Sequence, residues 1–163
     1  MKVRTWKPIL AASLIFNLLL LSLVGHSFWV RDTRADVGPN GEDLAPYMAQ
    51  MQHLSHKLGL SIQAHNAPLA SFYIEEMQET AGIIQKKFPT YDKVAVGTLM
   101  GAMLVPQFSP LARAVTASNW AISNAGYAKL LESCNGCHAA ANHGFIHITT
   151  PTGNPFNQSF SPQ

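Results

Sequence analysis

Charged side chains are scarce in this chain, since Asp, Glu, Lys and Arg make up 12% of its 163 residues. Three of the eleven basic residues lie within the first seven positions. Eight therefore remain beyond them against nine acidic residues, which gives the rest of the chain a net charge of −1. No block or stripe of basic residues is among them. Because proteins that bind nucleic acid gather Lys and Arg on one face, nucleic acid is not an expected partner.

The chain also lacks the residue patterns of common enzyme classes. It has no phosphate-binding glycine loop, and neither a nucleophile–base pair nor a carboxylate dyad is evident. A peroxidase would need a distal acid–base group, for which Arg113 and the histidines are available, but no spacing singles one out. We therefore expect a protein that is not an enzyme, with peroxidase-like activity left open.

The N-terminus carries the one long hydrophobic run. A positively charged head precedes it, made of Lys2, Arg4 and Lys7. The run from Ile9 to Val30 would measure roughly 33 Å as a helix, which is enough to cross a bilayer. No small-x-small cleavage site follows Val24, and Trp6 and Trp29 lie where interfacial aromatic residues are expected. Residues 1–30 are therefore predicted as an uncleaved transmembrane signal-anchor with its head in the cytoplasm. Cleavage would instead leave a soluble periplasmic protein.

Beyond the anchor, a polar linker at 31–43 leads to segments with the apolar periodicity of amphipathic helices. We expect four of them, at 44–65, 68–88, 92–105 and 109–141. Pro106 is expected to end the third, and the fourth has candidate breaks at Asn119 and at 124–126. The predicted fold is all-α, a four-helix bundle over residues 44–142 with an extended C-terminal tail at 143–163.

Only two cysteines are present, and they belong to one motif. Cys134, Asn135, Gly136, Cys137 and His138 form the C-x-x-C-H pattern of covalent haem attachment. On a helix, positions i, i+3 and i+4 share a face. Two sulfurs on that face can form thioethers with one edge of a porphyrin, and the imidazole that follows can ligate its iron. The motif predicts one covalent haem c, bound by Cys134 and Cys137, with His138 as an axial ligand of the iron.

Two other interpretations of the cysteines remain. A thioredoxin-like dithiol needs its first cysteine at a helix N-terminus, where the helix dipole lowers the thiol pKa. Cys134 instead lies near the end of a predicted helix. A zinc site could draw on both cysteines, His138 and His143. Neighbouring positions on a helix point about 100° apart, however, so Cys137 and His138 converge poorly on a small ion.

A C-x-x-C-H motif on the last helix of a four-helix bundle resembles the class II c-type cytochromes, the cytochrome c prime group. The resemblance covers residues 44–142, and Cys134, Cys137 and His138 carry over by motif. It implies an antiparallel bundle, one haem c, and either electron transfer or the binding of small gases. The tail at 143–163 departs from the group, whose chains usually stop soon after the motif.

The second axial ligand has several candidates. They are Met48, Met51, Met77, His53, His56 and His65. Met51 and His56 are the two we single out, although a methionine on an apolar stripe is more often core packing. A protein ligand would suit a one-electron carrier at the outer face of a bacterial cytoplasmic membrane, with redox proteins of the membrane or periplasm as partners. An open position would suit a haem protein that binds NO or CO.

Overall fold

The structure is a computed structural model that describes residues 41–163. The predicted signal-anchor at 1–30 and nearly all of the predicted linker at 31–43 lie outside the described residues. Within the part that is described, no helix combines the length and the apolar character that a membrane span requires.

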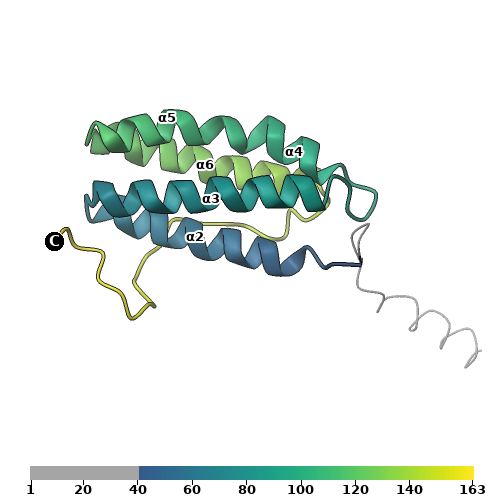
Figure 1. Cartoon of the computed structure of the whole chain (residues 1–163), viewed down its shortest axis with the longest axis horizontal. Helices are drawn as coiled ribbons and strands as arrows, with labels where there is room; N and C mark the ends of the chain where they lie inside the picture. Colours follow the sequence, from purple (N-terminus) through teal and green to yellow (C-terminus); the bar gives the residue numbers. More distant parts are fainter. Residues whose placement is uncertain (1–40) are drawn as a thin grey trace, which may run out of the picture. The chain divides into compact units, whose positions relative to one another are not determined.

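The described chain is an all-α helical bundle with no strand between residues 41 and 163, as the sequence predicts. Its helices are α2 (Ala45–Gln63), α3 (Ala67–Lys87), α4 (Val96–Met103), α5 (Val105–Thr116) and α6 (Trp120–Ala140). Figure 1 shows α4 and α5 following one another along a single arm of the bundle. Helix α3 packs on α2, α4 and α5, while α6 packs on α5, α4 and α2. The bundle therefore has four arms around one core, formed by α2, by α3, by α4 together with α5, and by α6.

The ends of α2 and α3 follow local signals. Asn66 caps α3, because its side-chain oxygen accepts a hydrogen bond from the Leu69 amide at 3.2 Å. Pro68 lies in the first turn, where its missing N–H leaves no hydrogen bond unmade. Helix α2 ends at Gln63, two residues earlier than predicted, and His65 in the connecting turn has a positive φ of 57°.

The boundary between the third and fourth predicted segments was wrong. Pro106 does not end a helix but lies in the first turn of α5, which begins at Val105 rather than at 109. Pro110, expected near a helix start, lies inside α5. The fourth predicted segment is interrupted at residues 117–119, which confirms the candidate break at Asn119 and not the one at 124–126. There the side-chain oxygen of Asn119 accepts from the Ile122 amide at 3.2 Å and caps α6.

Small residues on α4 serve helix packing. A Cβ atom added at Gly97 would lie 3.1 Å from the Gln85 carbonyl oxygen, and one at Gly101 would lie 2.9 Å from the Gln85 side-chain nitrogen. Both glycines therefore let α4 approach α3 closely.

Residues 143–163, here called the C-terminal strap, have no helix and return along the bundle beside α2 (Figure 1). Side chains of α2, of α3 and of the turn between them hold the strap by hydrogen bonds. Gln63 donates to the Pro151 carbonyl at 3.0 Å, Asn66 donates to the Phe160 carbonyl at 3.1 Å, and the Tyr73 hydroxyl donates to the Gln158 side chain at 2.9 Å. The ring of Phe160 is buried in the core, with 7% of its surface exposed. The strap is thus part of the packed domain.

Candidate functional site

All three residues of the motif that could bind a cofactor line one pocket. Cys134, Cys137 and His138 lie on the last two turns of α6 and form one wall of it. The cavity beside them measures about 50 Å³. The helical spacing that the sequence pointed to therefore places these side chains where a bound group could reach all of them.

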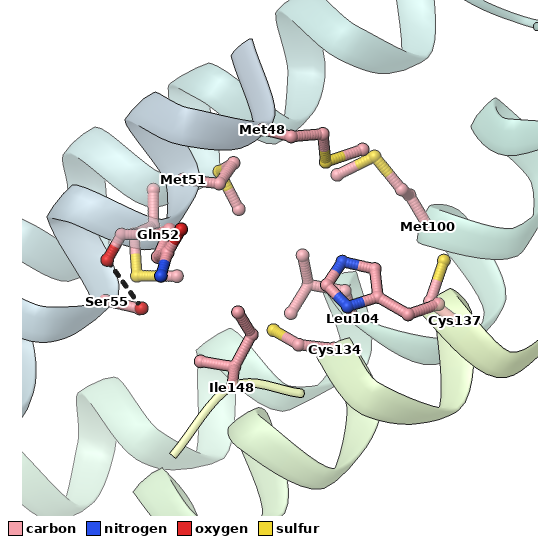
Figure 2. A pocket seen from close by; sticks show the side chains of 11 residues that line it. Met48, Met51, Gln52, Ser55, Met100, Leu104, Cys134, Cys137 and Ile148 are labelled. Atoms are coloured by element: carbon pink, nitrogen blue, oxygen red, sulfur yellow. Dashed lines mark hydrogen bonds between the residues drawn. The ribbon is translucent and has the colours of Figure 1, made fainter. Parts of the chain in front are cut away.

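The remaining walls of the pocket come from three other helices and from the strap. Their side chains are Met48, Met51, Gln52 and Ser55 of α2, Met77 of α3, Met100 of α4, Leu104 and, from the strap, Ile148. Figure 2 shows Met48, Met51 and Met100 pointing into the same space as Cys134. None of the described residues that line the pocket is Asp, Glu, Lys or Arg. The interior is therefore apolar and rich in thioethers.

Both cysteines are free thiols in a poorly solvated position. Burial raises the pKa of Cys134 to about 11, and the adjacent Cys137 adds to the rise. Burial also raises the pKa of Cys137. Both groups are therefore protonated and uncharged at neutral pH. This is the opposite of the low-pKa thiolate that a thioredoxin-like dithiol uses, and Cys134 lies in the second half of α6 rather than at its N-terminus.

The structure does not bring the ligands of the zinc alternative together. Between residues 41 and 163 no group of three or more His, Cys, Asp or Glu side chains is arranged to hold a metal ion. His143, the fourth ligand of that alternative, does not line the pocket. Its Nδ1 atom lies 2.7 Å from the Ala141 carbonyl oxygen.

The imidazole of His138 is fixed by the strap. Its Nδ1 atom lies 3.0 Å from the carbonyl oxygen of Ile146. Because a carbonyl can only accept a hydrogen bond, Nδ1 carries the proton and Nε2 keeps a free lone pair. Histidines that ligate metals are commonly held in this way, since the outer hydrogen bond sets the tautomer and the ring orientation. His138 thus presents Nε2 as a preoriented ligand.

Asn135, which separates the two cysteines with Gly136, holds the same part of the strap. Its Nδ2 atom donates to the Ile148 carbonyl at 2.9 Å, and the Ile148 amide donates to its Oδ1 atom at 2.7 Å. Sequence reasoning missed this pair because nothing local marks two residues thirteen apart as partners. Gly136 faces α4, because a Cβ atom added there would lie 2.7 Å from the Met103 methyl carbon.

The histidines proposed as a second axial ligand do not line the pocket. The rings of His53 and His56 contact the strap residue Phe156, with centroids 4.9 and 5.2 Å apart. His56 also donates from Nε2 to the Gly153 carbonyl at 3.0 Å. The ring of His65 stacks on Trp120 at 4.8 Å.

Methionines supply the pocket-facing candidates. Met48, Met51 and Met77, all named from the sequence, line the pocket together with Met100. Met100 was not considered as a ligand, although its spacing of four from Val96 and from Leu104 marks it as belonging to the buried face of α4.

No family model, curated protein or solved structure matches this chain. The motif and the pocket geometry therefore carry the functional argument.

Proposed function

We propose that this protein is a monohaem c-type cytochrome that carries single electrons. The observation that carries the proposal is the shared pocket: Cys134, Cys137 and His138 line it from one side, and thioether side chains line it from the other. The resemblance of the motif and the bundle to class II c-type cytochromes supports the same assignment.

The donor set fits haem c. The two thiols on one face of α6 would attach the cofactor, and Nε2 of His138 would ligate its iron. Bound haem would supply a centre that changes oxidation state by one electron. The apolar pocket limits the entry of water, and low solvent exposure is one of the features that set the potential of such a centre. The Ile146 carbonyl accepts a hydrogen bond from Nδ1 of His138 and would orient the ring toward the iron.

For the second axial ligand we propose a methionine, with Met51 as the first choice. It lies on α2 and only 7% of its surface is exposed, and Figure 2 shows it pointing into the pocket. His56, the other residue singled out from the sequence, is engaged by Gly153 and Phe156 of the strap. A thioether ligand would leave the iron six-coordinate and favour electron transfer over gas binding.

Four matched substitutions identify the ligand. Met48→Leu, Met51→Leu, Met77→Leu and Met100→Leu each replace a thioether with a hydrocarbon of similar volume. We expect one of them, Met51→Leu, to abolish the weak far-red absorption band of ferric haem bound by methionine. The reduced wild-type protein should not change its spectrum when mixed with CO. Rapid stoichiometric CO binding by the wild type would replace the carrier with the gas-binding alternative.

We further propose that the domain is tethered at the outer face of a bacterial cytoplasmic membrane. The apolar segment at 1–30 would anchor it, and the linker of 31–43 would let it move over roughly 20 Å as a flexible coil. Confinement to the membrane raises the effective concentration of the domain near membrane redox proteins. Its net charge of about −1 predicts weak electrostatic steering, and therefore brief encounters with those partners.

Covalent attachment is the direct test of the proposal. After acid–acetone extraction, haem should remain with the wild-type polypeptide. Replacing both Cys134 and Cys137 with Ala should make it extractable. Haem that extracts freely from the wild type, or a purified protein without haem from cells that mature other c-type cytochromes, would contradict the assignment.

A further inference from the structure

The strap is joined to the last turns of α6 at two neighbouring points. The Asn135 side chain exchanges two hydrogen bonds with the backbone of Ile148, at 2.9 and 2.7 Å. One turn further along α6, His138 donates from Nδ1 to the Ile146 carbonyl at 3.0 Å. Positions 135 and 138 share a face of the helix, and residues 146 and 148 are two apart on an extended segment. The two attachments therefore fix the same short stretch of the strap.

The loop between these points is held by its own backbone. The amide of His143 donates to the His138 carbonyl at 2.7 Å, and the amide of Ile146 donates to the His143 carbonyl at 2.9 Å. The hydrogen bond between His138 and the Ile146 carbonyl is nevertheless exposed, so water competes for it. A single hydrogen bond there would be a weak constraint. The paired bonds of Asn135 stabilise the register that keeps Ile146 opposite His138.

We propose that Asn135 is a positioning residue for the haem site: it clamps Ile148 and thereby holds the Ile146 carbonyl on His138. The inference rests on the proposed cytochrome function. A hydrogen bond from Nδ1 makes an imidazole more electron-rich and so stabilises oxidised iron. Loss of the clamp weakens that bond and raises the reduction potential. It also loosens Ile148, which forms part of the pocket wall.

Gln63 of α2 offers a matched control, because it also holds the strap but does so away from the motif. Gln63 donates one side-chain hydrogen bond to the Pro151 carbonyl at 3.0 Å and is not part of the pocket lining. Asn135→Leu and Gln63→Met each replace an amide with an apolar side chain of similar shape, without a change in charge. Both variants weaken the attachment of the strap, but only the first acts on the segment that contacts His138.

The experiment compares the full-length holoproteins of the wild type and both variants. Asn135→Leu should keep its covalent haem, raise the midpoint potential and shift the paramagnetic NMR signals of the His138 ring. In hydrogen–deuterium exchange, the peptide around Ile148 should open roughly tenfold more often, the effect expected for loss of one to two hydrogen bonds. Gln63→Met should leave the potential and the His138 signals as in the wild type.

Several results would overturn the inference. An unchanged potential in Asn135→Leu, or an equal shift in Gln63→Met, would show that Asn135 merely helps to attach the strap. If the leucine variant does not accumulate, Asn135→Ala removes the same two hydrogen bonds with less volume and is judged by the same readouts. Absence of covalent haem from the wild type would contradict the proposed function itself, whereas normal attachment with an unchanged potential contradicts only the role of Asn135.

Discussion

Gly59 lies at the crossing of α2, α6 and the C-terminal strap, and replacing it with alanine tests that crossing. A Cβ atom added there would lie 2.6 Å from the hydroxyl oxygen of Tyr127 and 2.7 Å from the Cγ atom of Pro151. Tyr127 cannot easily move away, because its buried hydroxyl donates to the Ser55 carbonyl at 2.9 Å. We therefore expect Gly59→Ala to destabilise the protein.

The magnitude follows from two opposing effects. Replacing glycine with alanine inside a helix stabilises it by about 0.8–1 kcal/mol. Overpacking a core site costs about 1–3 kcal/mol, and weakening the hydrogen bond of Tyr127 adds about 0.5–1.5 kcal/mol. The net loss in the free energy of unfolding for Gly59→Ala is then about 2 kcal/mol. Gly82 of α3 is the matched control, since a Cβ atom added there has nothing within 4 Å. Gly82→Ala should stabilise the protein by up to about 1 kcal/mol.

Urea denaturation of the two variants, followed by circular dichroism, measures the difference. The helix-propensity gain is common to both, so their separation of about 3 kcal/mol reports the steric and hydrogen-bond costs at the crossing. If Gly59→Ala proved as stable as Gly82→Ala, neither Tyr127 nor Pro151 could lie where the structure places it. The reasoning about the strap would then fail with it.

Three further predictions concern the strap and the anchor. Burial, helped by the nearby charges of Lys57 and His56, lowers the pKa of His53 below its ordinary value of 6.5, so the folded state binds fewer protons than the unfolded state. This part of the stability is present above pH 6.5 and is lost as the pH falls below it; His53→Gln should flatten the pH dependence of the urea midpoint. Phe160→Ala should weaken strap docking by roughly 3 kcal/mol and speed limited proteolysis after residue 150, and unchanged cleavage would contradict the packing. The native protein should resist carbonate extraction from membranes with residues 1–30 present in its intact mass, and a mature chain beginning between residues 25 and 40 would refute the anchor.

The bundle was predictable where a local signal has one structural meaning. Asn66 and Pro68 mark the start of α3 in the sequence, and the structure uses both of them there. Pro106 shows the limit of such signals. A proline can follow the end of one helix or stand in the first turn of the next, and residues 103–106 satisfy both conditions. The choice depends on how α4 and α5 pack on α3, which periodicity does not reveal.

The residues of the candidate site likewise divide into those that the sequence could predict and those that it could not. Cys134, Cys137 and His138 were found from the sequence because their convergence needs nothing more than helical spacing. The opposite wall requires the crossing of three helices, so the sequence could name methionines but could not separate those facing the pocket from core packing. The role of Asn135 could not be predicted from the sequence, because the chain reaches its partner Ile148 only after it leaves α6 and turns back.

The hydrogen bond on His138 is important because charged side chains are lacking around it. From Ser133 to Gln163 the chain contains no Asp, Glu, Lys or Arg, and none lines the pocket within the described residues. A haem protein tunes its potential through the axial ligands, nearby hydrogen bonds, burial and neighbouring charges. With ionised side chains absent from the pocket lining, the axial ligands, burial and the Ile146 carbonyl carry most of that control in the proposed carrier. The segment that supplies the carbonyl also contains no Asp, Glu, Lys or Arg, so salt should have little effect on its docking. In the proposed carrier the strap would therefore hold His138 in the same geometry over a range of salt concentrations.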